Sequence, residues 1–212
     1  MPATPTIGPE PMVKKSEPLL YLASSSPRRQ AILKALRLEF SVEAVEVDES
    51  PLAEESPEQL VLRLATAKAA AARVDASRFV LGSDTVVVLD GEVLGKPRDR
   101  EEAVAMLLCL SGRRHSVLTG VALRGPHGVR TTLSRTDVRF REISRDEALA
   151  YWQSGEPCDK AGAYGIQGLG GVFVEAIEGS YSGVVGLPVY ETGKLLQDAG
   201  IDVLVRQTDH DG

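Results

Sequence analysis

The sequence predicts an α/β fold in which helices flank a mixed central β-sheet and a cleft lies between two lobes. Early in the chain, short apolar runs alternate with segments of helical spacing, which is typical of strands that alternate with helices. Further on, long strand-like segments follow one another directly, and Asp90-Gly91 is a strong signal for a two-residue hairpin turn. We therefore expect parallel and antiparallel strands in one sheet.

The first strand and helix are expected on either side of a hydroxyl-rich turn. Residues 19–23 form an apolar run of strand length, and residues 30–38 have helical spacing. Ser26 suits the N-cap because its side-chain oxygen can accept a backbone N–H, and Pro27 suits the first helical position, where a missing donor costs nothing. The turn therefore predicts a well-defined helix start.

Two arginines, Arg28 and Arg29, make this helix start the most informative part of the chain. Free backbone amides, the positive end of the helix dipole and a guanidinium group would all point at one place, which favours a phosphate site. The alternative is a capped helix whose arginines lie on a solvated face.

Periodicity and turn signals predict the next elements. Residues 40–47 alternate as a strand, and residues 57–73 have the spacing of an amphipathic helix. Residues 79–89 form an apolar strand with a break at Gly82-Ser83-Asp84, and the turn at Asp90-Gly91 leads into a return strand at Val93-Leu94.

The second half is expected to hold the longest strands. The predicted elements are a helix over 100–110, strands over 115–123 and 129–140 joined by a turn at 125–128, a helix over 145–153 capped by Ser144, a Gly-rich loop with short extended pieces over 161–171, a helix over 187–199 and a strand over 201–205.

The length of 212 residues is enough for one bilobed domain with a full core, which we expect over residues 18–207. Residues 1–17 are rich in Pro, Thr and Glu without apolar periodicity, so we expect a disordered N-terminal extension there. Residues 208–212 are expected to form a C-terminal tail.

Composition restricts the partners and the compartment. The net charge of −6 argues against a nucleic-acid-binding surface but allows a local basic pocket for a small ligand. No run has the length of a membrane span, and the N-terminus lacks the apolar region of a signal peptide. Cys109 and Cys158 follow no metal-ligand pattern, which indicates reduced thiols in a cytoplasmic protein, with Cys109 in the core.

Acidic residues near strand ends are the candidates for chemistry. Asp84 interrupts an apolar run, where an unpaired carboxylate would be costly, so a metal ion, a cation or water should compensate it. Asp48 and Glu49 close another strand, and either could share a divalent ion with Asp84. The alternatives are a turn aspartate at Asp84 and an exposed acidic turn at Asp48, which we favour for Asp48.

Lys68 and Lys96 are the candidate cations outside the first helix. Lone lysines are normally solvated, but together with the two arginines they could neutralise a polyphosphate. The chain has neither a Walker lysine motif nor a Rossmann glycine fingerprint, which disfavours nucleotide binding by those routes.

Several short segments, in chain order, carry a further signal: Leu22 to Arg29, Val47-Asp48-Glu49, Arg63 to Ala69, Gly82-Ser83-Asp84-Thr85, Gly95-Lys96-Pro97, Ser111-Gly112, Thr119-Gly120, Asp159 to Gly168 and Gly179-Ser180-Tyr181-Ser182. With these segments the chain resembles the Maf family of nucleoside triphosphate pyrophosphatases over about residues 19–205. The resemblance implies a bilobed fold similar to that of inosine triphosphatases. One departure is Gly183, where relatives commonly have asparagine.

The resemblance implies hydrolysis of a nucleoside triphosphate between its α- and β-phosphates, with a divalent metal, to the monophosphate and pyrophosphate. Asp84 matches the family's proton acceptor. Arg28, Thr85 and Gln167 match the residues of the subgroup that acts on dTTP and UTP. A homodimer is also expected from the resemblance.

The remaining site residues are expected around these positions. Glu49 and Asp84 would hold the metal, Mg²⁺ in the cell with Mn²⁺ or Co²⁺ as substitutes. Arg29, Lys68 and Lys96 would hold phosphate oxygens, with Ser24 and Ser26 as further donors, and Lys160 in the matching Asp159 to Gly168 segment is included among the substrate-binding residues. Gln167 can donate to and accept from one edge of uracil or thymine.

Two other functions stay open at this point. One is a nucleotide-binding regulator of cell division that does not need turnover. The other is a pyrophosphatase for 7-methyl-GTP or for deaminated purine nucleotides. Modified pyrimidine triphosphates are also open as cellular targets.

Overall fold

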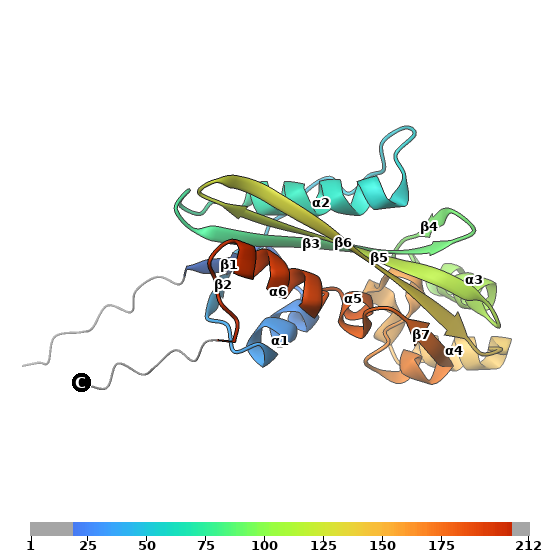
Figure 1. The fold of residues 1–212 in the computed structure, drawn as a ribbon. Helices are drawn as coiled ribbons and strands as arrows, with labels where there is room; N and C mark the ends of the chain where they lie inside the picture. Colours follow the sequence, from blue (N-terminus) through green and yellow to red (C-terminus); the bar gives the residue numbers. More distant parts are fainter. Residues whose placement is uncertain (1–18, 205–212) are drawn as a thin grey trace, which may run out of the picture.

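The computed structural model describes residues 19–204 and contains a seven-stranded mixed sheet (Figure 1). The strands are β1 (Leu20–Leu22), β2 (Phe40–Val42), β3 (Phe79–Leu89), β4 (Glu92–Leu94), β5 (Arg114–Gly125), β6 (Gly128–Phe140) and β7 (Val174–Glu178). The α-helices are α1 (Pro27–Ala35), α2 (Pro57–Ala71), α3 (Arg100–Leu110), α4 (Arg145–Gln153), α5 (Tyr181–Val185) and α6 (Val189–Asp198). The 3₁₀-helices are η1 (Glu156–Asp159), η2 (Ala161–Ala163) and η3 (Leu169–Phe173).

The sheet has the order β2-β1-β3-β5-β6-β7, with β4 paired to β3 outside this path. β1 pairs in parallel with β2 and β3, whereas β3, β5, β6 and β7 pair antiparallel. The prediction of a mixed α/β sheet flanked by helices is therefore confirmed.

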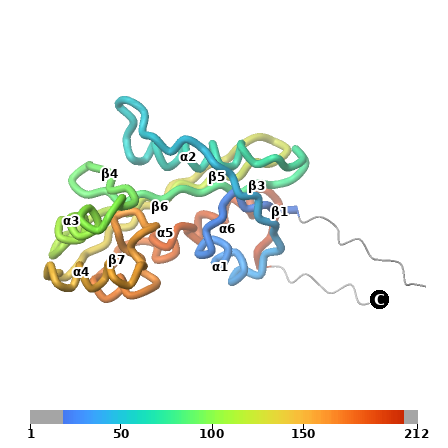
Figure 2. Tube along the Cα trace, turned by 180° about the vertical axis from the view of Figure 1, so that it is seen from behind, coloured from blue at the N-terminus to red at the C-terminus, as the bar shows by residue number. Residues whose placement is uncertain are grey.

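Helices cover both faces of the sheet (Figures 1 and 2). α2 lies along one face, while α1 and α6 lie on the other face at the end near β1. One apolar cluster joins α1 and α6 to β1, β3 and β5, and includes Leu22, Leu33 and Leu196, all fully buried. A second cluster, around Leu107 and Phe140, joins α3 and α4 to the far end of the sheet. These two clusters are two apolar centres that are built on the same strands, β3 and β5.

An open stretch of strand edge lies between these centres. β5 pairs with β3 from Val80 to Val88 along one edge. The other edge is paired with β1 at Phe79–Leu81 and with β4 at Val87–Leu89. Within residues 19–204, no strand pairs with this second edge between residues 82 and 86. The gap places that part of β3 next to a cavity.

Local capping explains where several helices start. Ser26 Oγ accepts from the Arg29 amide, and Pro27 is the first residue of α1, as predicted. Ser144 begins α4 with a reciprocal capping box to Glu147. Ser56 begins α2 in the same way with Gln59. Each cap satisfies backbone amides that have no partner inside the helix.

Two predictions about strands are wrong, and in both cases the contacts between distant parts of the chain give the reason. The strand expected over 40–47 ends at Val42 because its partner β1 ends opposite it at Leu22. The break expected in residues 79–89 is absent, since β3 runs through without interruption. Ser83 and Asp84 stay in the strand because Ser83 donates to the Gly186 carbonyl at 2.9 Å and Asp84 pairs with Lys68.

Other differences lie in the last third of the chain. Residues 161–171 contain 3₁₀-helices rather than extended pieces. Neither β7 nor α5 was expected, and β7 is mostly exposed, so it lacks the apolar alternation that would predict it. No strand forms over 201–204, where Ile201 and Val203 pack against the core without a strand partner.

Cys109 is exposed, contrary to the prediction that it packs in the core, because α3 buries a different face made of Ala103, Val104, Leu107 and Leu110. None of the helices in the described part of the chain has the length and apolar character needed to cross a membrane. The extension expected over 1–17 and the tail expected over 208–212 lie outside the described residues.

Candidate functional site

A cavity of about 1000 Å³ lies at the open edge of β3. Its walls come from the β1–α1 turn, α2, β3, the segment after β4 and residues 156–168. Every residue predicted for the site lines it: Ser24, Ser26, Arg28, Arg29, Glu49, Lys68, Asp84, Thr85, Lys96, Lys160 and Gln167. Residues that lie up to 143 positions apart in the sequence therefore face one space.

The start of α1 forms one wall of the cavity. Arg29 donates from Nε to the Gly186 carbonyl at 2.9 Å and from Nη1 to Ser24 Oγ at 3.2 Å. These bonds hold the guanidinium group beside the N-terminal end of α1. This wall has the cationic group and helix end that an anion requires.

Lys68 lies between two carboxylates in the centre of the site. Its Nζ is 2.5 Å from Glu49 Oε1 and 2.6 Å from Asp84 Oδ1. Asp84 and Lys68 are buried, with 7% and 9% of their surface exposed. Because a buried carboxylate is costly without a charged partner, the ammonium group explains how β3 tolerates an aspartate.

Glu49 is half-exposed at the cavity wall. Burial raises its pKa, but the hydrogen bond and charge of Lys68, with smaller contributions from Lys96 and Arg29, hold that pKa below the ordinary value. Lys96 Nζ lies 3.9 Å from Glu49 Oε2. Glu49 is therefore ionised at neutral pH.

Asp48 does not line the cavity. Its side chain accepts from the Ser50 amide at 2.9 Å, which is the geometry of an exposed turn. The favoured interpretation of Asp48 as an acidic turn residue agrees with this position, and the alternative that it shares an ion with Asp84 does not.

The donor set fits a magnesium ion bound together with a substrate. Glu49 and Asp84 are the two carboxylates that share the ammonium group of Lys68, so a cation already bridges them. Residues 19–204 contain no group of three or more His, Cys, Asp and Glu side chains that could hold a metal by themselves. Mg²⁺ is commonly bound by one or two carboxylates with phosphate oxygens and water as the other ligands.

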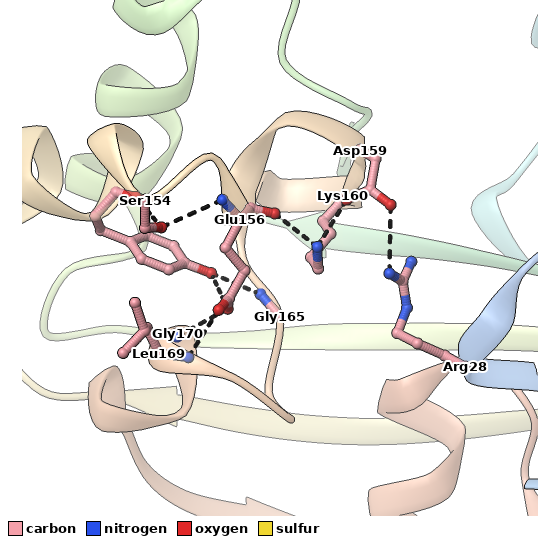
Figure 3. A network of polar contacts seen from close by, with 9 residues as sticks. Arg28, Ser154, Glu156, Asp159, Lys160, Gly165, Leu169 and Gly170 are labelled. Atoms are coloured by element: carbon pink, nitrogen blue, oxygen red, sulfur yellow. Dashed lines mark hydrogen bonds and ion pairs between the residues drawn. The ribbon is translucent and has the colours of Figure 1, made fainter. Parts of the chain in front are cut away.

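Asp159 and Lys160, from the segment 156–168, face the start of α1 across the cavity (Figure 3). Arg28 Nη1 lies 3.3 Å from Asp159 Oδ2, and Lys160 Nζ lies 2.7 Å from Asp159 Oδ1. Lys160 also donates to the Glu156 carbonyl at 2.6 Å. Asp159 thus connects one cation from each side of the cavity.

Thr85 lies on β3 next to Asp84. Its hydroxyl is oriented by the buried Thr119 of β5. Thr85 Oγ1 is 2.9 Å from Thr119 Oγ1, and Thr119 donates to the Gly183 carbonyl at 2.8 Å. Gln167 is exposed in the loop between η2 and η3, at the cavity wall.

Residue-by-residue inspection missed four residues in or behind the cavity walls: Thr119, Glu156, Asp159 and Tyr164. Glu156 and Asp159 come directly before the Gly-rich segment. Two acidic residues beside so many glycines were the signal that could have indicated a role in the site. Thr119 belonged to a segment of the family resemblance but received no role, because its effect depends on pairing between β3 and β5.

The chain is similar to several known proteins over most of its length. The family described as Maf-like protein matches residues 19–199. A dTTP/UTP pyrophosphatase of Saccharophagus degradans is 54% identical over 182 residues, which cover 84% of this chain and 87% of that protein. A dTTP/UTP pyrophosphatase of Vibrio cholerae is 54% identical over 179 residues, covering 84% of this chain and 96% of that protein.

Solved structures show only a weak likeness. A HAM1 protein from Coxiella burnetii is 18% identical with a TM-score of 0.42, over 59% of this chain and 73% of that chain.

Proposed function

This chain belongs to the Maf-like protein family, and on that premise we propose that it hydrolyses dTTP and UTP to the monophosphate and pyrophosphate. One observation carries the proposal: the buried Asp84 carboxylate shares a cavity with cations contributed by both lobes. The printed names of the two relatives support the choice of substrate.

The proposed reaction is attack of water on the α-phosphorus. Lys68 binds Asp84 through Oδ1, and Asp84 accepts the proton of the attacking water. As the new P–O bond forms, the bond from the α-phosphorus to the bridging oxygen breaks and pyrophosphate leaves with the electron pair.

The cations of the cavity neutralise the negative charge of the phosphate oxygens during this reaction. Arg29, Lys68 and Lys96 bind non-bridging phosphate oxygens, and Ser24 and Ser26 add hydrogen bonds. Arg28 and Lys160 approach from the two sides of the cleft. Glu49 and Asp84 would hold Mg²⁺, or Mn²⁺ or Co²⁺ in its place, which supplies further neutralisation of the phosphates when bound.

The base is recognised by Gln167 and Thr85. The amide of Gln167 both donates and accepts, so it can pair with the imide edge of uracil or thymine. Thr85 shapes the base or sugar pocket from β3. This proposal places the enzyme in the cytoplasm, as a homodimer, without a nucleic-acid or membrane partner.

A nucleotide panel tests the proposal. Purified protein with Mg²⁺ is given dTTP, UTP, 7-methyl-GTP and ITP, and the products are identified. We expect pyrophosphate as the first product and faster turnover of the two pyrimidine nucleotides. Faster purine turnover would contradict the substrate assignment, and orthophosphate as the first product would move cleavage to the terminal phosphate.

Asp84→Asn tests the role of the proton acceptor. We expect a loss of at least about 100-fold in kcat, the usual scale for a missing general base, with unchanged folding by circular dichroism. A variant that retains wild-type turnover would show that Asp84 is not the base. Retained nucleotide affinity without any turnover in the wild type would favour a binding regulator instead.

A further inference from the structure

The loop that carries Gln167 is fastened at both of its ends to two side chains outside it (Figure 3). Before Gln167, the Gly165 amide donates to the Tyr151 hydroxyl at 3.0 Å. After Gln167, the amides of Leu169 and Gly170 donate to Glu156 Oε2 and Oε1 at 2.8 and 3.1 Å. Each of these hydrogen bonds is donated by a backbone amide of the loop, so it positions the loop backbone directly.

Tyr151 and Glu156 are also bonded to each other. The Tyr151 hydroxyl donates to Glu156 Oε1 at 2.6 Å. An ionised carboxylate can only accept, so this hydroxyl must give its hydrogen to Glu156 and use its oxygen to accept the Gly165 amide. Burial raises the pKa of Glu156, but the bonds from Tyr151 and the two amides hold it below its ordinary value, so the carboxylate stays ionised.

The loop sequence has to match this pair of side chains. A Cβ at Gly168, the residue after Gln167, would lie 2.2 Å from Glu156 Oε2. Glycine therefore lets the backbone reach the carboxylate. Tyr151 itself is fixed on α4, with only 5% of its surface exposed and its ring packed edge-on against Phe173 at 5.2 Å.

Glu156 also contacts the phosphate-binding side of the cavity. Its carbonyl accepts from Lys160 Nζ at 2.6 Å, and Lys160 is paired in turn with Asp159. One residue thus connects the base-recognition loop to a cation of the cavity.

We propose that Glu156 and Tyr151 are positioning residues for base selectivity. They hold the backbone of the loop so that the Gln167 amide meets the imide edge of uracil or thymine, with which it pairs better than with cytosine, whose ring nitrogen at that edge lacks a hydrogen. This inference rests on the proposed function, because it assigns the selectivity of that same site. Neither residue takes part in the attack on the α-phosphorus.

The variants Glu156→Gln and Tyr151→Phe test this role with UTP and CTP. E156Q places an amide hydrogen where the carboxylate accepts from the loop, and Y151F removes the bridging hydroxyl. We expect each variant to lower the ratio of kcat/KM for UTP over CTP by about ten-fold, through a higher KM for UTP. The kcat for UTP should change less than the KM.

Gln167→Ala shows whether Glu156 changes the UTP/CTP ratio through Gln167. If Glu156 acts through Gln167, the double variant E156Q/Q167A should have the same UTP/CTP ratio as Q167A alone. A purely structural role would lower turnover of both nucleotides equally and would leave the UTP/CTP ratio unchanged. Glu175→Gln and Tyr190→Phe are matched controls, because both residues are exposed and lie outside the cavity wall.

The outcomes separate this inference from the function on which it rests. A wild-type UTP/CTP ratio in folded E156Q and Y151F would overturn the inference while the proposed function stands. An additive effect with Q167A would overturn it as well. If E156Q does not fold, Y151F decides, since it leaves both amide bonds to Glu156 in place. Failure of the wild type to release pyrophosphate from UTP would instead overturn the proposed function together with the inference.

Discussion

At the scale of single residues, Thr119 decides which way the Thr85 hydroxyl points, although Thr119 is fully buried and does not line the cavity. Each hydroxyl has one hydrogen, and Thr119 gives its own to the Gly183 carbonyl. Thr85 must therefore donate to Thr119, which leaves its lone pairs to face the cavity. A substrate group that reaches Thr85 has to be a donor, such as the imide N–H or a sugar hydroxyl.

Thr119→Val should therefore weaken catalysis without touching the substrate. The Thr85 hydroxyl loses its acceptor and can turn its hydrogen toward the cavity, so we expect kcat/KM for UTP to fall about ten-fold. Thr119→Ser keeps the hydroxyl and should restore most of the activity. Steady-state kinetics with 3′-deoxy and N3-methyl analogues tell which donor of the substrate is involved. Equal kcat/KM for T119V and the wild type would disprove the argument.

At the scale of elements, the position of Lys68 depends on how closely α2 approaches the sheet. A Cβ at Gly120 of β5 would lie 2.4 Å from the Val61 carbonyl of α2. Gly120 is paired with Asp84 in the neighbouring strand. The same close approach that packs α2 on the sheet thus brings its lysine to the carboxylate of β3.

Gly120→Ala should push α2 away from the sheet. We expect a loss of at least about 1–3 kcal/mol in the free energy of unfolding from overpacking, and reduced activity because Lys68 moves away from Asp84. Gly193→Ala is the matched control in α6, where an added Cβ meets no atom within 4 Å. It should stabilise the protein by about 0.5–1 kcal/mol, as alanine does inside a helix. Urea denaturation of both variants measures this, and equal stabilities would contradict it.

The packing of β5 against the Gly-rich segment predicts a pH effect. His115 is 3% exposed, lies 2.9 Å from the Tyr164 hydroxyl and packs edge-on against Phe140. Burial lowers its pKa to about 4, with a smaller opposing effect of Asp137. The unfolded chain therefore binds a proton at a higher pH than the folded chain does.

Stability should fall as the pH decreases from about 6.5 to about 4, because over that window protonation of His115 favours the unfolded state. The expected loss between pH 7.5 and pH 5 is about 2 kcal/mol. His115→Gln should remove this slope. His127→Gln, in the exposed turn between β5 and β6, should keep it. Urea denaturation at both pH values provides the measurement, and identical slopes for the wild type and H115Q would contradict the assignment.

At the scale of the whole molecule, β3, β5 and β6 run along the length of the sheet (Figure 1). The cavity lies at the open edge of β3. The ion pair between Arg28 and Asp159 joins two walls of this cavity. Both side chains are partly exposed, so the pair should contribute less than about 1 kcal/mol to stability. In the proposed function its larger effect is on the two cations, because Asp159 would compete with phosphate for Arg28 and Lys160.

Asp159→Asn should bind triphosphate more tightly without changing stability. With this competing carboxylate removed, we expect the KM for dTTP to fall several-fold and the melting temperature to stay within experimental error. Both are read from steady-state kinetics and thermal denaturation. A higher KM would show that Asp159 mainly holds the two cations in place.

Local sequence signals predicted the features that depend only on residues close together in the chain. The caps at Ser26 and Ser144 involve residues only three positions apart, so the sequence carries them in full. Eleven of the side chains that line the cavity were also predicted, most of them because they lie in segments that resemble those of related chains, whereas Glu156, Asp159 and Tyr164 were missed. Their roles in catalysis and binding stay predictions until the variants are measured.

The sequence by itself determined the alternating elements, the helix starts and the residue types of the site. The tertiary structure decided that β3 continues through Asp84, that Lys68 bridges Asp84 and Glu49, and that Glu156 and Tyr151 fasten the Gln167 loop. The reason is physical: a cap or a turn is completed within a few residues, whereas these contacts depend on strand pairing and helix packing across distant parts of the chain.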